Sequence, residues 1–208
     1  MKFALDGIPA IYGSILVTGL FMLVHPLPVF IMSCITGLII WFYRDPDRDI
    51  PSEPGLFVSP ADGKVVEIER VSHKLIGKSL KIGIFMNIFS VHVNRAPCDG
   101  VIEYMNYVPG KKIAAFSPKA SEINERFYVG LRTPHGVVLL VQIAGLLARR
   151  IVCRRKVGDA LERGERYGMI KLGSKVDVYL PEEVSVKVKI GDKVHAGKSV
   201  IAEIGCRV

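Results

Sequence analysis

The stretch KVDVYLPEEVSVKVKIGD, residues 175–192, contains two short runs rich in β-branched residues and ends on a Gly-Asp pair. β-Branched and aromatic residues favour strands, and Gly and Asp favour the turns between them. Similar runs recur along the chain, with turn signals between them, at residues 64–71, 80–85, 101–108, 127–132, 137–143 and 199–204. This spacing predicts a mostly β fold with antiparallel strands, closed as a barrel or packed as a sandwich.

The tail at residues 188–197 resembles a structural hairpin of biotinyl- and lipoyl-type carrier domains. In those domains the modified lysine lies at a different turn, so Asp192-Lys193 is not predicted to be a carrier site. The resemblance implies a fold related to the biotinyl/lipoyl-like hybrid folds. It also keeps a membrane-anchored β-barrel adaptor or carrier among the alternatives.

The N-terminal part of the chain has a different composition. Residues 7–43 contain no Asp, Glu, Lys or Arg, and the segment HPLP at 25–28 interrupts them. Because proline removes a backbone donor, the sequence predicts two helices, at about residues 8–24 and 29–43. Both would be apolar nearly all round, so residues 1–48 are predicted to form a membrane-anchoring helical hairpin. Each helix is shorter than the ~20 residues that cross a bilayer, which leaves open whether the hairpin spans it or lies in one leaflet.

Lys2 and Arg44 flank this apolar stretch. In a hairpin they emerge on the same side, and the positive-inside tendency places that side in the cytoplasm. We therefore expect a protein of the cell membrane with the domain that follows the apolar stretch on the cytoplasmic side. A cleaved signal peptide is the rival interpretation, although polar sequence begins late for one, and a pair of buried core helices is a third.

The composition narrows the choice of partners. Of 208 residues, 50% are hydrophobic and 23% charged, which excludes a disordered or collagen-like chain. The whole net charge of +8 lies beyond the apolar stretch, so an anionic phospholipid membrane is the predicted partner. Aromatic residues at 8% argue against nucleic acid as a partner. The four cysteines form no CxxC pair and no paired histidines occur at ligand spacing, so we predict no metal site.

Three residues in separate motifs could act together. Asp62 lies in SPADGKV, His92 in FSVHVNRAP, and Ser174 follows Gly173. Each alone has a plainer interpretation, as a turn, a structural or a bulge residue. Together, a carboxylate can orient an imidazole that takes a proton from a hydroxyl. A serine hydrolase would use such a set, but Ser174 has no Gly-x-Ser-x-Gly elbow around it.

Seven motifs follow one another along nearly the whole chain: FYRDP at 42–46, SPADGKV at 59–65, VHVNRAP at 91–97, KASEINER at 119–126, QIAGLLARRI at 142–151, GERYGMI at 164–170 and Gly173-Ser174. With them the chain resembles a phosphatidylserine decarboxylase proenzyme of the short, membrane-anchored type. The resemblance implies that residues 49–208 form a decarboxylase domain that cleaves itself between Gly173 and Ser174. It also implies that Ser174 is converted into a pyruvoyl cofactor.

The reaction implied by this resemblance converts phosphatidylserine, or an ether-lipid analogue, to phosphatidylethanolamine in phospholipid biosynthesis. The pyruvoyl carbonyl would form a Schiff base with the amine of the serine-headed lipid and act as an electron sink. The implied catalytic residues are Asp62, His92 and Ser174, with His92 as the acid that returns a proton to the carbanion. The two cleaved chains are expected to stay associated, and the oligomeric state, including a homo-oligomer, stays open.

The chain departs from longer family members at two positions. They carry a second histidine where this chain has Arg95, and a threonine where it has Lys175. Since those members use the second histidine in cleavage, another group must do its work here. His73 and His135 are the candidate substitutes, each with a plain surface residue as the alternative.

The densest basic cluster in the sequence comprises Arg149, Arg150, Arg154 and Arg155. A guanidinium fork matches the oxygens of phosphate in pairs, so Arg149 and Arg150 are candidate ligands for the lipid head group. A solvated basic face is the alternative.

Overall fold

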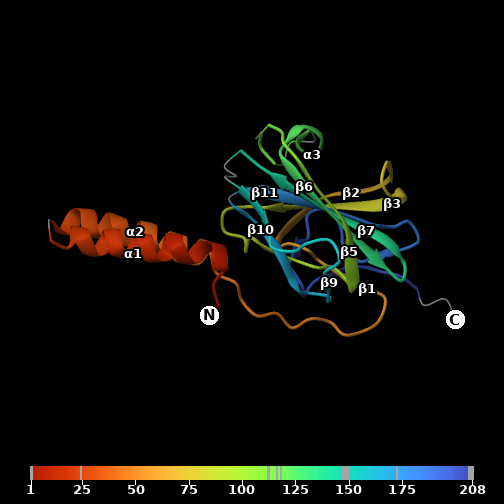
Figure 1. Cartoon of the computed structure of the whole chain (residues 1–208), viewed down its shortest axis with the longest axis horizontal. Coiled ribbons are helices and arrows are strands. Elements are labelled where there is room, and N and C mark those ends of the chain that lie inside the picture. The colour runs from red at the N-terminus through yellow and green to blue at the C-terminus, as the bar shows by residue number, and fades with distance from the viewer. Residues whose placement is uncertain are drawn as a thin grey trace. The chain divides into compact units, whose positions relative to one another are not determined.

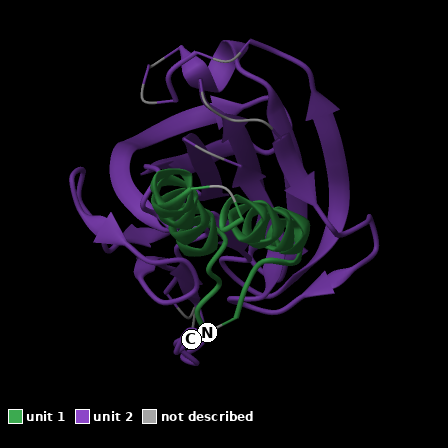
Figure 2. Cartoon of the chain, turned by 90° about the vertical axis from the view of Figure 1, so that its left-hand side faces the viewer, with its two compact units in different colours: residues 1–47 green, residues 48–208 purple. Residues whose placement is uncertain are grey.

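The computed structural model describes residues 2–23, 25–111, 113–115, 117, 119–146, 150–171 and 173–205. The chain divides into two compact units, residues 1–47 and residues 48–208, coloured green and purple in Figure 2. The first unit is helical, and the second consists mainly of strands.

The first unit is a pair of helices that lie side by side (Figure 1). A short 3-10 helix, Leu5–Gly7, leads into α1, Ile8–Phe21, and α2 follows as Pro26–Phe42. The start of α2 precedes the predicted start at residue 29, because prolines in a first turn lack only N–H groups that have no intrahelical partner there. The His25 side chain accepts a hydrogen bond from the backbone N–H of Leu27, at 3.3 Å, and caps this helix.

This helix pair is polar inside and apolar outside. The hydroxyls of Thr18 and Thr36 meet at 3.0 Å between the helices, and the buried side chains of α1 and α2 are Ser14 and Thr36. Large apolar side chains are exposed along both helices: Tyr12, Leu16, Leu20, Leu27, Phe30, Leu38 and Trp41. Water-soluble helices show the reverse distribution. Within the described part of the chain, neither helix has the length and apolarity of a membrane span.

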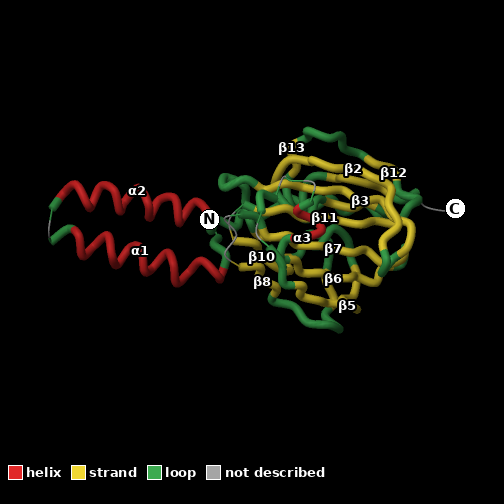
Figure 3. Tube along the Cα trace, turned by 90° about the horizontal axis from the view of Figure 1, so that it is seen from above, coloured by secondary structure: helices red, strands yellow, loops and turns green. Residues whose placement is uncertain are grey.

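The second unit confirms the predicted antiparallel β fold class. Its largest sheet curls like half a barrel, and its strands lie side by side in the order (Figure 3) β13 Lys193–Val194, β2 Gly63–His73, β3 Gly77–Met86, β11 Ser174–Pro181, β7 Gly136–Ala144, β6 Arg126–Thr133, β5 Gly100–Val108 and β9 Ala160–Leu161. Two smaller sheets accompany it, one of β1 Leu56–Val58, β14 Val200–Glu203 and β12 Ser185–Val186, the other of β4 Val93–Arg95, β10 Arg166–Lys171 and β8 Arg150–Cys153. One short helix, α3, covers Ala120–Ile123.

The predicted strand at residues 184–190 is wrong beyond β12. That strand pairs only with β14, at Ser185 opposite Glu203 and Val186 opposite Ala202. The alternating sequence VSVKVKI continues past this point, but an alternating pattern becomes a strand only where a partner supplies its backbone hydrogen bonds.

Alternate residues of the central strands point into the curl of the sheet and form the core. The buried members of this cluster from the three central strands are Leu80, Ile82, Ile84 and Met86 of β3, Val138, Leu140 and Ala144 of β7, and Val176, Val178 and Leu180 of β11. Because side chains alternate along a strand, Ser174 lies on the same face as Val176.

Candidate active site

Ser174 is the first residue of β11 and lies between the last residues of the neighbouring strands. It is directly opposite Met86 of β3 and Ala144 of β7, both members of the core cluster. The serine is fully buried, and its Oγ has no hydrogen-bond partner among the described residues. A buried hydroxyl without a partner costs free energy, so its presence calls for a functional explanation.

The glycine before this serine has an unusual conformation. Gly173 has a φ of +50°, in the left-handed region that glycine enters without strain. Its carbonyl packs directly on Gly145, where an added Cβ would lie 2.0 Å from the Gly173 oxygen and 3.0 Å from the Cβ of Ala115. The peptide bond between Gly173 and Ser174 therefore follows a left-handed backbone turn at Gly173, and its carbonyl packs against Gly145.

His92 is fully buried in the loop between β3 and β4. Its Nδ1 lies 2.8 Å from the carbonyl oxygen of Ser90, which can only accept a hydrogen bond. In the neutral ring the proton therefore sits on Nδ1, and Nε2 carries the lone pair. The His92 carbonyl accepts a hydrogen bond from Ile170 N at 3.3 Å, close to the end of β10 that leads into Ser174.

Two buried amides contact each other near the strand ends that flank the serine, and sequence reasoning missed both. Gln142 lies on the same face of β7 as Ala144, and its Nε2 donates to the Oδ1 of Asn94 at 2.8 Å. The Asn94 Nδ2 in turn approaches the sulfur of Met86 at 3.8 Å. A fully polar side chain inside the apolar run VVLLVQIA was the signal that could have identified Gln142.

Asp62 has partners other than the predicted ones. Its two carboxylate oxygens accept hydrogen bonds from Arg48 Nη2 at 2.9 and 2.8 Å, and one also accepts from Ala196 N at 2.8 Å. His195 Nδ1 lies 3.5 Å from the other oxygen. Within the described ranges no hydrogen bond joins Asp62 to His92 or to Ser174. The histidine beside this carboxylate is thus His195, which sequence reasoning placed in a structural hairpin.

Neither candidate substitute for the second family histidine lies near Ser174. His73 is at the far end of β2, where its ring packs 4.8 Å from that of Tyr179, and burial followed by the charge of Lys81 lowers its pKa. His135 lies in the turn between β6 and β7, at the opposite end of β7 from Ala144.

The residue at the position of the second family histidine has a structural contact. Arg95 is buried, and its Nη1 donates to the carbonyl of Gly164 at 3.0 Å. Its backbone N–H donates to Pro60 O at 2.9 Å, which ties β4 to the loop that carries Asp62.

The two arginines predicted to bind phosphate differ in what the structure says of them. Arg150 is exposed at the start of β8, directly opposite Lys171 of β10. Arg149 lies outside the described residues.

Lys175, which follows the buried serine, points to the opposite face of the sheet and joins a buried cluster of charges. Its Nζ contacts the Glu67 carboxylate, an Asp177 oxygen at 3.0 Å and Ser121 Oγ at 3.1 Å. Lys81 lies 2.6 Å from Glu67 and 3.5 Å from Asp177. Two lysines thus balance two carboxylates, and together they fix the first residues of β11 against β2, β3 and α3.

This cluster predicts a specific pH dependence of stability. Burial alone would raise the pKa of Glu67, but hydrogen bonds and charges from Lys175 and Lys81 outweigh it and hold that pKa below its ordinary value. A carboxyl of this kind stabilises the fold above its unfolded pKa of about 4.5, and the stability is lost as the pH falls through the folded pKa. Because Glu67 is only half-buried and solvent screens its pairs, we expect Glu67→Gln to lose about 1 kcal/mol of unfolding free energy at neutral pH and to flatten the acid limb of the stability curve.

Denaturant unfolding from neutral to acid pH measures both effects. The matched control is Glu69→Gln, an exposed carboxyl two residues along the same strand, which should follow the wild type. If Glu67→Gln kept the acid dependence of the wild type, Glu67 would not be the titrating group.

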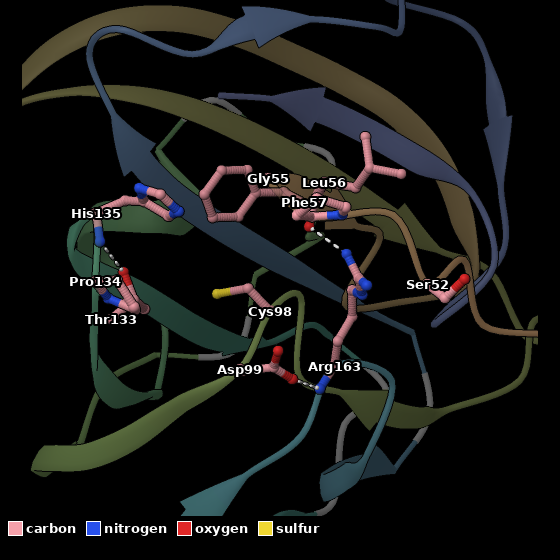
Figure 4. Close-up of a pocket in the computed structure, with 11 residues that line it drawn as sticks. Ser52, Gly55, Leu56, Phe57, Cys98, Asp99, Thr133, Pro134, His135 and Arg163 are labelled. Carbon is pink, nitrogen blue, oxygen red and sulfur yellow. Dashed lines mark hydrogen bonds between the residues drawn. The ribbon is translucent and has the colours of Figure 1, made fainter. Parts of the chain in front are cut away.

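A cavity of about 310 Å³ lies at the other end of the sheet from Ser174 (Figure 4). Arg163 and His135 line it, together with Cys98, whose thiol pKa burial raises to about 12. A thiol that stays protonated at neutral pH is a poor nucleophile, so Cys98 is a weaker candidate nucleophile than Ser174.

Comparisons with known proteins give the class. A protein of Cupriavidus pinatubonensis is 46% identical, with 97% of this chain and 94% of its own length aligned, and one of Symbiobacterium thermophilum is 43% identical over 97% and 95%. One of Ralstonia nicotianae is 49% identical over 82% and 80%. All three are named phosphatidylserine decarboxylase proenzyme, so the mostly β unit with its Gly173-Ser174 pair belongs to a carboxy-lyase made as a proenzyme.

The family model for phosphatidylserine decarboxylase matches residues 35–202, which include the end of the first unit, most of the second and every candidate site residue. The chain belongs to the phosphatidylserine decarboxylase family, whose members act in phospholipid biosynthesis. The predicted family and enzyme class are therefore confirmed, and the adaptor and serine hydrolase alternatives lose their support.

Proposed function

We propose that this chain decarboxylates phosphatidylserine, or an ether lipid with the same serine head, to phosphatidylethanolamine, using a pyruvoyl group made from Ser174. The observation that carries the proposal is the geometry of the pair Gly173-Ser174. The Ser174 hydroxyl is buried without a described partner, Gly173 has a left-handed backbone conformation, and the Gly173 carbonyl packs against Gly145. The family membership supplies the reaction.

The proposed self-cleavage would use this arrangement in four steps. The Ser174 hydroxyl loses its proton to a base and adds to the Gly173 carbonyl carbon, the C–N bond breaks, and the nitrogen takes up a proton, leaving an ester. Removal of the Ser174 Cα proton then breaks the Cβ–O bond and frees the Gly173 carboxylate. The remaining enamine takes a proton at Cβ, and water displaces ammonia to leave a ketone. The pyruvoyl group carries no charge, so it suits a site between Met86 and Ala144.

The proposed roles of the other residues follow from their contacts. When present, the ketone supplies an electrophile for the substrate amine and a sink for electrons as carbon dioxide leaves. Because Nδ1 of His92 is fixed on Ser90, we assign to its Nε2 the uptake of a proton and the return of that proton to the substrate carbon. Asp62 holds Arg48 and faces His195, which makes His195 the candidate for the work of the second family histidine.

Head-group binding is assigned to the edge where β10 leads into Ser174. Arg150 is exposed at the start of β8, directly opposite Lys171 of β10, so this edge is positively charged. The phosphate of a serine-headed lipid has the charge that complements this edge. Arg149 stays a prediction.

The helix pair is proposed to anchor the protein in the cell membrane, with the catalytic unit on the cytoplasmic side. Its exposed apolar surface and its internal Thr18–Thr36 contact match a segment surrounded by lipid. At the C-terminal end of α2, the Arg44 guanidinium lies 4.1 Å from the ring centre of Trp41. Tryptophan and arginine together are typical of the membrane–water interface.

The two chains produced by cleavage are proposed to stay associated. β11 would begin the smaller chain, and it lies between β3 and β7 with backbone pairing along both edges. The charge cluster around Lys175 ties its first residues to Glu67 and Lys81.

We also propose that the tail at residues 188–197 is related to the hairpins of biotinyl- and lipoyl-type domains.

The intact mass of the purified full-length protein under denaturing conditions tests the function. We expect two chains that meet at Gly173 and Ser174, the smaller one beginning with a ketone that reacts with hydrazides. An active, folded sample that consists of a single chain of 22.9 kDa would contradict the proposal.

A further inference from the structure

Ser174 lies at one end of the curled sheet, and the loops at that end carry exposed apolar side chains. β3 ends at Met86 and β7 ends at Ala144, both directly opposite Ser174, so the loops that follow these strands leave from the same end. Three large apolar residues on them are exposed to solvent by 46%, 62% and 66%: Ile88, Phe89 and Leu146.

The same end carries cations in an unusual arrangement. Lys64 is directly opposite Lys193 in the β2–β13 pair, and Arg150 is directly opposite Lys171 in the β8–β10 pair. Like charges directly opposite each other in a sheet repel. Among the described residues, the salt bridges include none formed by Lys64, Lys193 or Arg150. Lys64, Lys193 and Arg150 are all exposed, so this end calls for an anionic partner.

The other end of the β2–β3 ribbon lacks this arrangement. Its turn exposes one large apolar residue, Leu75, together with Lys74 and Lys78. Lys78 is opposite Ser72 and not opposite another cation. The ribbon thus offers a matched surface of similar composition far from Ser174.

We propose that the Ser174 end of the catalytic unit is itself a docking surface for an anionic lipid bilayer. The docking rim consists of the apolar residues Ile88, Phe89 and Leu146 and the cations Lys64, Lys193 and Arg150. A bilayer offers anionic head groups above an apolar layer, which satisfies both kinds of residue at once. A polyanion would leave the apolar side chains in water, and an apolar protein groove would leave the cations without counter-charges.

This inference deepens the proposed function, on which it rests, because it names the surface through which a lipid substrate reaches Ser174. It also differs from the helical anchor. The helix pair keeps the chain on the membrane, whereas the docking rim sets which end of the catalytic unit meets the lipid.

Tryptophan fluorescence in the full-length protein tests the docking rim. The chain has one tryptophan, so a Trp41→Phe background allows Phe89→Trp and its matched control Leu75→Trp to report separately. The probe is vesicles of brominated phosphatidylcholine with phosphatidylglycerol. We expect the emission of Phe89→Trp to shift to the blue and to be quenched, while Leu75→Trp keeps its emission. Absence of quenching for Phe89→Trp, or equal quenching of both, overturns the proposal.

Charge reversal tests the cations in the same assay. Lys64→Glu with Lys193→Glu should abolish quenching of Phe89→Trp, whereas Lys74→Glu with Lys78→Glu should leave it unchanged; equal effects of the two pairs would overturn the role of the docking rim. Every measurement is repeated in the Ser174→Ala chain, so the result does not depend on self-cleavage or decarboxylation. Quenching of Trp41 in the native chain reports the anchor independently.

Discussion

Replacing Ser174 with alanine is expected to leave one chain of 22.9 kDa and no decarboxylase activity. The hydroxyl is the only atom of residue 174 that can add to the Gly173 carbonyl, and the ketone is made from the same residue. Both the cleavage and the carbonyl chemistry therefore disappear together, unlike the loss of a single acid–base group, which costs typically 10²–10⁴-fold. The measurements are intact mass and release of carbon dioxide from phosphatidylserine.

The structure predicts that this variant folds. Ser174 Oγ is buried without a described partner, so its removal takes away a hydroxyl that gains nothing from the fold and leaves a methyl among apolar neighbours. The Ser174→Ala protein should be at least as stable as the uncleaved wild type. Ser185→Ala, at an exposed position in β12, is the control that should process normally. Two normal fragments from Ser174→Ala would disprove the mechanism.

The strands of the large sheet could be predicted because each is a local run of β-branched residues bounded by turn residues. The runs at 64–71, 80–85, 101–108, 127–132, 137–143 and 175–180 fall within β2, β3, β5, β6, β7 and β11. Strand length and pairing could not be read in the same way. The run at 184–190 has the same pattern, but its partner β14 is four residues long and pairs with it at two.

The candidate site was only partly predictable. Ser174 and His92 stand in motifs that can be read one at a time, and both proved fully buried. The partners of Asp62 come from positions 48, 195 and 196, which no local pattern connects. Gln142 and Asn94 meet only because β7 and β4 approach each other in the core, so their hydrogen bond depends on the tertiary structure and no local sequence pattern predicts it.

Gly145→Ala is expected to slow self-cleavage by about 100-fold without preventing folding. The new Cβ would lie 2.0 Å from the oxygen and 2.9 Å from the carbon of the Gly173 carbonyl, so the carbonyl must move by about an ångström. Displacement of a reacting group by ~1 Å can cost about 10²-fold in rate. Time-resolved intact mass after synthesis in a cell-free system measures the rate.

Crowding also lowers stability, by about 1–3 kcal/mol, and that effect must be separated from the effect on the carbonyl. Gly100→Ala is the matched control, because its Cβ would lie 2.9 Å from the Arg132 carbonyl, at the end of the sheet away from Ser174. The two variants should unfold at similar denaturant concentrations, yet Gly100→Ala should cleave at the wild-type rate. Equal cleavage rates in both variants would show that the contact between Gly145 and the Gly173 carbonyl serves packing alone. The left-handed conformation of Gly173 would then be sufficient to position the peptide bond for cleavage.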